Sequence, residues 1–337
     1  MPAREIRGAI HVHTSYSDGS GSMEEIIDAA RAASLDFLIV TDHDTVRAAK
    51  DGFAGRHKDL LVLVGGEVSP SGGGHCLALG DVDITGFRWM PERFYLHKLR
   101  RDGADVYIAH PEGRMKPTFG IRLRQWHAWE EEHFDGLEIW SYMHDWIESV
   151  TPLNIPFYYL NPDKAITGPD RRVLGLWDRL NVHRRVTGIG ALDAHAVRML
   201  FGIFVAFEYE KLFGTILTHV FVDNWGEDPV DDAGELRRAL RQARTFVAYD
   251  ALAPARGFDF RTAQGLGIGA RGRLGEGTTL EVTLPREAQV KLIHNGRHVD
   301  EKTAACAEFE ASQTGVYRIE VHLGGRPWIF SNPIFLG

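Results

Sequence analysis

The stretch AIHVHTSYSDG, residues 9–19, ends an apolar run in two histidines and a carboxylate. His11 and His13 stand two residues apart, and side chains at positions i and i+2 of a strand point to the same face. We therefore expect both imidazoles to face one site while Val12 faces the other way. Asp18 follows just before a glycine, where it could either close the SDGS turn or join the histidines as a ligand.

Short apolar runs alternate with helix-type segments on both sides of this stretch, up to about residue 250. Residues 6–13 (IRGAIHVH) and 35–44 (LDFLIVTDHD) read as strands, and the apolar run of the second is typical of a strand buried on both faces. Between them, Ser22 and Glu25 form a capping box that opens a helix. This alternation predicts a parallel α/β fold.

Several of the predicted strands carry a polar residue at the carboxyl end, where parallel barrels place their active sites. We expect these side chains to converge although they are scattered along the chain. They are Asp42, His43, Glu67, His75, His110, Asp193 and His195. Imidazole and carboxylate are the ligands that Zn, Mn and Fe accept, and the set is too large for one ion. The sequence therefore predicts a centre of two or three divalent metal ions (Mn, Fe or Zn).

A change of sequence pattern near residue 252 predicts two domains. Residues 1–251 form the α/β part, with an insertion at about 141–185 that is rich in proline and aromatic residues and lies near the mouth of the site. From residue 252 onward, glycine-rich turns separate alternating runs, so residues 252–337 are expected to form a small antiparallel β domain.

Composition narrows the partners and the compartment. A net charge of −8 argues against a general nucleic-acid surface or an anionic membrane as partner, since both need a dominant basic face. The two cysteines, Cys76 and Cys306, are far apart and are expected to be small buried hydrophobes in a reducing cytoplasm. The N-terminus has no apolar leader segment, so we expect a cytoplasmic protein with no membrane association.

The polar motifs, taken in chain order, resemble those of the polymerase-and-histidinol-phosphatase (PHP) family. They are HxHTxxSDG at residue 11, then TDHD, GxE, a following His, an HP pair and a terminal DxH, and the resemblance runs from residue 8 to about 250. It implies a distorted (β/α)7 barrel and a metal-dependent phosphoesterase.

The resemblance also implies which residues hold each metal ion. The first ion would be held by His11, His13, Glu67 and Asp193, a second by Glu67, His75 and His110, and a third by Asp18, His43 and His195. In this arrangement Glu67 bridges two ions. His75 has an alternative role as a surface residue of the glycine-rich turn SGGGH.

Metal ions of this kind lower the pKa of a coordinated water from about 15.7 to about 7, so a hydroxide bridging the first two ions is the expected nucleophile. The general acid is left open between His195 and Asp42. For Asp42 a supporting role behind a ligand imidazole is favoured, and for Asp44 a cap of the following helix. His144 and Asp145 follow a strand and could line the mouth.

The chain ending at residues 315–337, together with LWDRL at 176–180, resembles the narrower carbaryl-hydrolase-like (CehA/McbA) branch. That branch is named for cleaving an aryl carbamate, so carbamate hydrolysis is considered beside phosphate-ester hydrolysis. Three hypotheses about the function remain. The leading one is a hydrolase of a small phosphorylated ester, either a monoester or a diester. The second is hydrolysis of a carbamate, carboxyl ester or amide at the same metals, and the third is a metal-containing binding or regulatory protein without hydrolase activity.

Substrate-binding residues and the oligomeric state stay open at this level. A substrate phosphate would need local cations on this acidic chain. The basic side chains nearest the motifs are Arg114, Lys116, Arg171, Arg172, Arg184 and Arg185. For each of them alone, an ordinary solvated role is favoured over phosphate binding.

Overall fold

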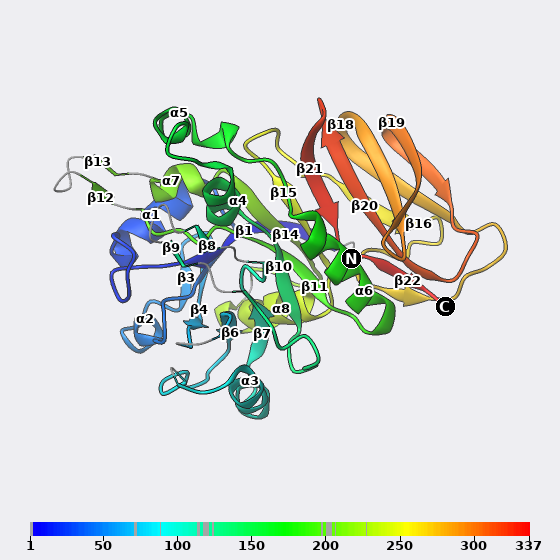
Figure 1. Ribbon diagram of the computed structural model, residues 1–337. Helices are drawn as coiled ribbons and strands as arrows, with labels where there is room; N and C mark the ends of the chain where they lie inside the picture. Colours follow the sequence, from blue (N-terminus) through cyan, green and yellow to red (C-terminus); the bar gives the residue numbers. More distant parts are fainter. Residues whose placement is uncertain are drawn as a thin grey trace.

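The computed structural model describes residues 3–70, 73–87, 89–112, 115–116, 121–122, 125–196, 198–199, 204–205, 207–226 and 228–337. They form a mixed α/β structure with two main sheets (Figure 1). Within the described ranges, no helix combines the length and the apolar character that a membrane span requires.

The larger sheet runs through the whole molecule, with β1 near its middle. Along the sheet the strands are β16 (Asp259–Thr262), β18 (Thr279–His294), β20 (Gly315–Leu323), β21 (Arg326–Ser331), β15 (Thr245–Tyr249), β14 (Ile216–Val222), β1 (Arg4–Val12), β2 (Phe37–Val40), β4 (Leu60–Val64) and β3 (Gly55–His57). Three more strands pair at the C-terminal end of this path, namely β17 (Arg271–Gly272), β19 (Arg297–Glu310) and β22 (Ile334–Leu336).

The smaller sheet holds the middle of the chain. Its strands in spatial order are β11 (Thr187–Ala191), β10 (Gly136–Ser141), β7 (Asp105–Ile108), β6 (Cys76–Leu79) and β5 (Gly66–Val68). Two short ribbons lie apart from both sheets, formed by β8 (Met115–Lys116) with β9 (Ile121–Arg122) and by β12 (Arg198–Met199) with β13 (Phe204–Val205).

The expectation of a parallel sheet is right for part of the fold. β1, β2 and β4 pair in parallel, and so do β7, β10 and β11. However, β14 is antiparallel to both β1 and β15, and β6 is antiparallel to both β5 and β7. The apolar content of these strands does not encode their direction, because a strand buried on both faces looks alike in either orientation.

Backbone hydrogen bonds join the two sheets at the strand ends. The Leu192 and Ala194 N–H groups donate to the carbonyls of Ile10 and His11 at 3.0 and 3.1 Å. On the other side, the N–H of Glu67 donates to the Asp42 carbonyl at 3.0 Å. These bonds bring the ends of β1, β2, β5 and β11 together. The closed seven-stranded barrel implied by the resemblance stays a prediction.

Helices flank the two sheets (Figure 1). The predicted capping box of Ser22 and Glu25 is confirmed and starts α1 (Met23–Ala32), which buries Met23, Ile26 and Ala30. The other helices are α2 (Arg47–Lys50), α3 (Glu92–Arg101), α4 (Tyr142–Ser149), α5 (Ile155–Leu160), η2 (Pro162–Lys164), α6 (Arg171–His183), α7 (Tyr209–Leu212) and α8 (Pro229–Arg241). The predicted insertion at 141–185 thus contains α4, α5 and α6.

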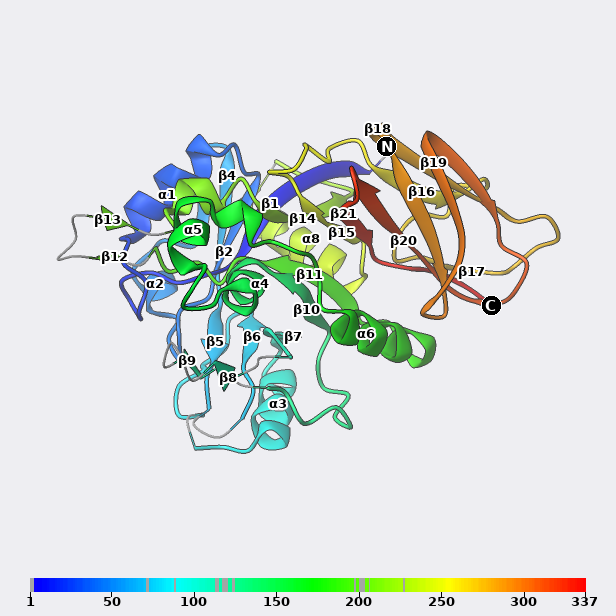
Figure 2. The same ribbon diagram turned by 45° about the horizontal axis from the view of Figure 1, so that its top comes forward.

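The C-terminal strands pack beside the α/β part with α6 against them (Figure 2). β21 pairs with β15, so the larger sheet continues across residue 252 without a break. A second hydrophobic core forms here around Trp328, whose indole N–H donates to the Ala253 carbonyl at 2.7 Å. Residues 252–337 are strand-rich as expected, whereas the domain boundary itself stays a prediction.

The cysteine expectation needs one correction. Both cysteines are free, and Cys76 is buried in β6 as predicted. Cys306 is exposed, because it falls on an outward-facing position of β19. Its prediction as a buried hydrophobe is therefore wrong.

Candidate metal centre

Four predicted ligands from three strand ends surround one point. His11 lies at the end of β1, His13 directly follows it, Glu67 lies in β5 and Asp193 follows β11. Glu67 Oε2 and Asp193 Oδ1 each lie 3.2–3.4 Å from the Nε2 atoms of both histidines. Both imidazoles are fully buried, and Glu67 is 0% exposed.

The distances between these atoms, and the lack of hydrogen-bond partners at both Nε2 atoms, fit a shared cation. Two ligands about 2.1 Å from one ion at a tetrahedral angle stand about 3.4 Å apart, close to the separations seen here. The Nε2 atoms of His11 and His13 are buried without any hydrogen-bond partner. Such buried polar atoms are rare unless a ligand or ion serves them. The donor set of imidazole and carboxylate suits Zn, Mn or Fe.

The backbone at this point is not a regular strand, which corrects the alternation argument. His11 has φ 67°, and the pairing of β1 with β2 shifts register between Ile10 and Val12. His110 and Asp193 also have positive φ, 28° and 54°. Such conformations are uncommon for residues other than glycine and cluster at functional sites. The imidazoles of His11 and His13 do meet, with ring centroids 5.0 Å apart, but a kink in the strand turns them together.

Glu138 in β10 holds two of the predicted ligands from behind. His11 Nδ1 lies 2.6 Å from Glu138 Oε1, and the backbone N–H of His110 donates to Oε2 at 2.9 Å. With Nδ1 engaged by this carboxylate, Nε2 of His11 is left to face the cation point. In the sequence Glu138 reads only as a polar residue of a buried strand. The available signal is that a carboxylate in such a run needs a partner.

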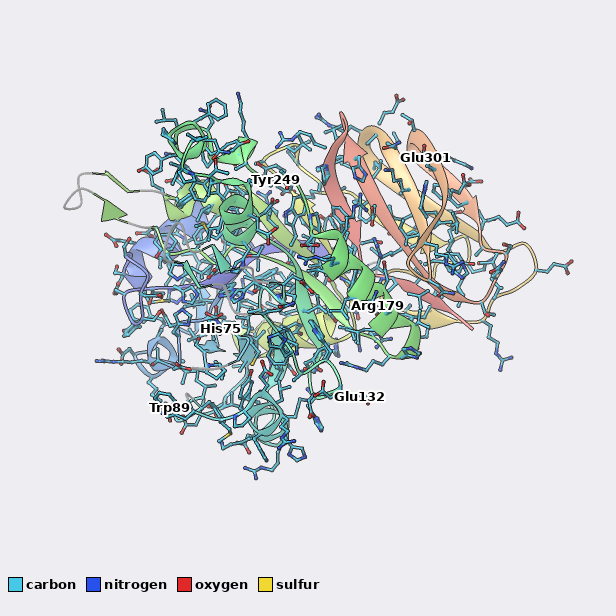
Figure 3. The ribbon with its side chains drawn as sticks, viewed as in Figure 1. His75, Trp89, Glu132, Arg179, Tyr249 and Glu301 are labelled. Carbon is cyan, nitrogen blue, oxygen red and sulfur yellow. The ribbon has the colours of Figure 1, made fainter. Side chains whose placement is uncertain are left out.

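The second oxygen of Glu67 faces two more predicted ligands. Oε1 lies 2.9 Å from Nδ1 of His75 and 3.1 Å from Nε2 of His110. His43 approaches the first oxygen, with Nδ1 at 3.0 Å from Oε2, and also contacts the Ser69 hydroxyl. Glu67 therefore has imidazoles on both oxygens, as a bridging carboxylate would. Figure 3 labels His75, which lies among the blue and cyan segments, far from Glu301 in the C-terminal strands.

A third group forms around Asp18 on the loop that follows β1. Its Oδ1 lies 3.3 Å from His195 Nε2 and 3.6 Å from His13 Nδ1, and its Oδ2 lies 3.6 Å from His43 Nε2. These four side chains form one of the donor groups compact enough for an ion. Gly19 permits the tight loop, because a Cβ there would stand 2.3 Å from the His13 carbonyl oxygen.

Mutual attraction overrides desolvation at four groups of the cluster, namely His11, Glu67, Asp18 and His195, whereas burial lowers the pKa of His13. Burial lowers the pKa of His11, but the nearby carboxylates, led by Glu138, raise it well above its ordinary value. Burial raises the pKa of Glu67, but His11 and other imidazoles hold it well below its usual range. In the same way, contact with His195 lowers the pKa of Asp18 to about 2, and the pKa of His195 rises to about 9. A divalent ion would replace the protons that these imidazoles hold.

The two aspartates of the TDHD motif are placed outside the donor groups. Asp42 accepts the N–H and the hydroxyl of Thr14 at 2.7 and 2.8 Å and the hydroxyl of Ser17 at 2.6 Å. This engagement favours a supporting role for Asp42 over that of general acid. The prediction that Asp44 caps a helix is wrong: α2 begins after Val46 with no side-chain cap, and Asp44 accepts the Ser69 N–H.

A cavity of about 390 Å³ opens beside the cluster. His110, Glu138 and His144 form its inner wall, so the expectation that His144 lines the mouth agrees with the geometry. Asp145 also borders it, but its carboxylate is held by Trp140, Thr167 and Gly168. Around its rim, the lining includes the carboxylates of Glu112, Glu148 and Asp170 and the guanidinium of Arg171.

Of the remaining basic candidates, Arg172 lies at the cavity edge, where it contacts Asp170 and Glu112, and the others lie elsewhere or are not described. Arg184 stacks on Phe134 and Arg185 on Phe335, away from the cavity lining. Arg114 and the side chain of Lys116 lie outside the described residues. Tyr209, which the sequence did not single out, braces the site because its one hydroxyl proton is shared between the His13 and His195 carbonyls, at 2.8 and 3.0 Å.

The fold and this cluster define a class of protein: a mixed α/β chain with a buried centre of histidines and carboxylates able to hold divalent metal ions. Within that class, residues 9–145 match the family model of the PHP domain. The matched segment contains His11, His13, Glu67 and His110 but ends before Asp193. The narrower resemblance to the carbaryl-hydrolase-like branch stays a prediction.

Comparison with curated proteins gives no match. Among solved structures, a two-domain protein of Bacteroides vulgatus containing a predicted PHP-like metal-dependent phosphoesterase is similar at 16% identity, over 98% of this chain and 95% of that chain, with a TM-score of 0.48. PsfC of Pseudomonas syringae is similar at 13% identity, over 75% of this chain and 94% of that chain, with a TM-score of 0.46.

Proposed function

We propose that the protein is a metal-dependent hydrolase of small phosphate esters. The observation that carries the proposal is the convergence of four side chains, in which the buried Nε2 atoms of His11 and His13 lie 3.2–3.4 Å from carboxylate oxygens of Glu67 and Asp193. Divalent ions held there would supply a water of lowered pKa and positive charge for the phosphoryl oxygens. The match of residues 9–145 to the PHP domain supports the same reading.

The protein's own residues supply orientation and a substrate cavity. Glu138 fixes the ring of His11, and Tyr209 ties the loop after β1 to the backbone of His195. The cavity beside the cluster receives the substrate, with Ile139 and Val173 offering apolar contacts. Trapping the ester between these walls and the donor cluster positions it for attack by water.

The test is hydrolysis by protein loaded separately with manganese, iron or zinc. The substrates are p-nitrophenyl phosphate, bis-p-nitrophenyl phosphate and 1-naphthyl N-methylcarbamate, and the controls are chelator-stripped protein and His11→Ala. We expect metal-dependent release of p-nitrophenol from a phosphate substrate, reduced on the order of a hundredfold or more in the variant. Turnover of the carbamate alone would overturn the phosphoesterase proposal.

One observation keeps a second function in view, namely hydrolysis of a carbamate, carboxyl ester or amide. The cavity rim carries Glu112, Glu148 and Asp170, and the nearby cations are already engaged. Arg171 contacts Glu320 at 3.1 Å, and Arg172 contacts Asp170 and Glu112 at 2.7 and 3.5 Å. Such a rim suits a substrate whose non-reacting part is neutral or cationic rather than polyanionic. If metal-loaded protein turned over none of the substrates, the third hypothesis, a metal-containing binding protein, would be favoured.

A further inference from the structure

Asp193 presents its two carboxylate oxygens to different imidazoles. Oδ1 faces the Nε2 atoms of His11 and His13, as described above. Oδ2 lies 3.5 Å from Nε2 of His144, a residue that the PHP resemblance does not include. This separation is longer than an ordinary hydrogen bond and close to the spacing of about 3.4 Å expected for two ligands of one ion.

His144 is held in place by the structure around it. It lies in the first turn of α4, and the next residue, Asp145, anchors that turn by accepting from Trp140 Nε1 and from the N–H groups of Thr167 and Gly168. The ring of His144 stacks on that of His110 with centroids 4.1 Å apart and planes 9° from parallel. The side chain is 13% exposed, and this exposure faces the cavity.

His110 has one ring nitrogen that no hydrogen bond engages. Its Nε2 contacts Glu67 Oε1, whereas its Nδ1 is buried with no hydrogen-bond partner. Together, His110, His144 and Asp193 place one donor atom each within the span of a single ion. Two imidazoles and a carboxylate oxygen form a ligand set that Zn, Mn and Fe all accept, with a further position left for water or substrate.

We propose that His144 is a metal ligand, and that with His110 and Asp193 it forms a metal position on the cavity side of the centre. Asp193 then bridges this position and the His11–His13 position, as Glu67 bridges from the opposite side. The ion at the His144 position is the one that the substrate meets first. This inference rests on the metal-binding part of the proposed function but not on the identity of the substrate.

The test measures metal content and affinity rather than turnover. His144→Ala and His144→Gln are compared with wild type and with His127→Ala, which removes an exposed histidine outside the cluster. Each protein is stripped, reloaded with manganese or zinc, dialysed and analysed for bound metal, and affinities are measured by calorimetric titration. We expect both His144 variants to lose up to one equivalent of metal or to bind one ion at least about tenfold more weakly. His127→Ala should match wild type.

Each other outcome has a defined meaning. If both His144 variants keep the metal content and affinities of wild type, the inference is wrong, and the proposed function is untouched. Unchanged metal binding with lost turnover would place His144 against the substrate and also overturn the inference. If wild type itself binds no divalent metal, the proposed function fails with it. Thermal unfolding of the stripped proteins checks that the variants fold, and His144→Gln provides the milder change.

Discussion

At the scale of single residues, His11 links sequence, backbone and site most directly. Its positive φ kinks the end of β1 and turns its ring toward that of His13. Glu138 then fixes the ring through Nδ1, so that Nε2 faces Glu67 and Asp193. A strained ligand of this kind persists only where its surroundings determine its position.

Replacing Glu138 by Gln should weaken metal binding while keeping the fold. The amide has the same shape but no charge, and only its oxygen can accept, so one of the two hydrogen bonds, from His11 Nδ1 or from the N–H of His110, is lost. We expect the affinity for the tightest-bound ion to fall about 10–100-fold. Calorimetric titration with zinc or manganese measures this, with the exposed Glu130→Gln as control. An unchanged affinity would mean that Glu138 only packs.

Asp18 is the residue for which sequence left a turn role and a ligand role open. Its side chain is 56% exposed, and its oxygens face His13, His43 and His195. Asp18→Ala should therefore lower the metal content and the turnover of the loaded protein while leaving the unfolding temperature of stripped protein within a few degrees of wild type. Asp28→Ala, an exposed aspartate of α1, is the matched control. If Asp18→Ala keeps the metal content of wild type, Asp18 is a turn residue and not a metal ligand.

At the scale of elements, β11 decides how the two sheets meet. Its glycines allow a close approach to the larger sheet: a Cβ on Gly190 would stand 2.6 Å from a methyl carbon of Val247 in β15. Asn332, fully buried after β21, bonds both the N–H and the carbonyl of Gly188 and also Thr245 of β15. Through β11, this junction sets the position of Asp193.

Asn332→Ala should cost the protein much of its stability. The change leaves the N–H of Gly188 buried without its Asn332 partner, with a penalty of about 1–3 kcal/mol, and leaves its C=O with the longer bond from the Thr245 hydroxyl at 3.3 Å. We expect the free energy of unfolding in urea to fall by about 2–5 kcal/mol. Asn224→Ala, at an exposed position, should lie within about 0.5 kcal/mol of wild type. Equal stability of the two variants would show that Asn332 does not hold β11 against β15.

At the scale of the whole molecule, buried charges tie distant segments together away from the metal centre. His219 of β14 is fully buried, with Nδ1 2.7 Å from Glu5 Oε1 and Nε2 3.2 Å from Asp250 Oδ1. Arg7 contacts the other oxygen of Asp250 at 2.7 Å. Another buried cluster joins Arg318 of β20 to Asp178 of α6. The continuous sheet and these contacts favour unfolding of the chain as one unit.

The His219 contacts predict a pH dependence of stability. Burial lowers the pKa of His219, but Asp250 and Glu5 outweigh it and raise that pKa above its ordinary value of 6.5. A raised pKa in the folded state stabilises the protein fully below 6.5 and loses this effect as pH rises through the folded pKa. His219→Gln should therefore be less stable than wild type by about 3 kcal/mol near pH 6.

The difference should shrink as the pH rises. Urea unfolding of wild type and His219→Gln at a series of pH values from about 6 to about 9.5 measures it. Because Arg7 stays charged across this range, it contributes equally at every point. A gap that stays constant with pH would mean that His219 is neutral in the folded protein.

What the sequence determined by itself is the chemistry of the donors and the local elements that carry them. The capping box of α1 and the apolar strands depend on neighbours a few residues away, so they can be read directly. The ligand candidates from His11 to His195 were all found in this way, and the structure brings them together around Glu67, Asp193 and Asp18. Their ligation of metal stays a prediction.

Only the tertiary structure decided which imidazoles face the same carboxylate oxygen. It also showed that Glu138 and His144 contact the predicted ligands. The structure also corrected three predictions. β14 and β6 are antiparallel to their neighbours, Cys306 is exposed, and Asp44 does not cap a helix. The physical reason is the same in each case. Strand order, strand direction and the kink at His11 fix distances between residues far apart in the chain, and no local pattern of side chains encodes those distances.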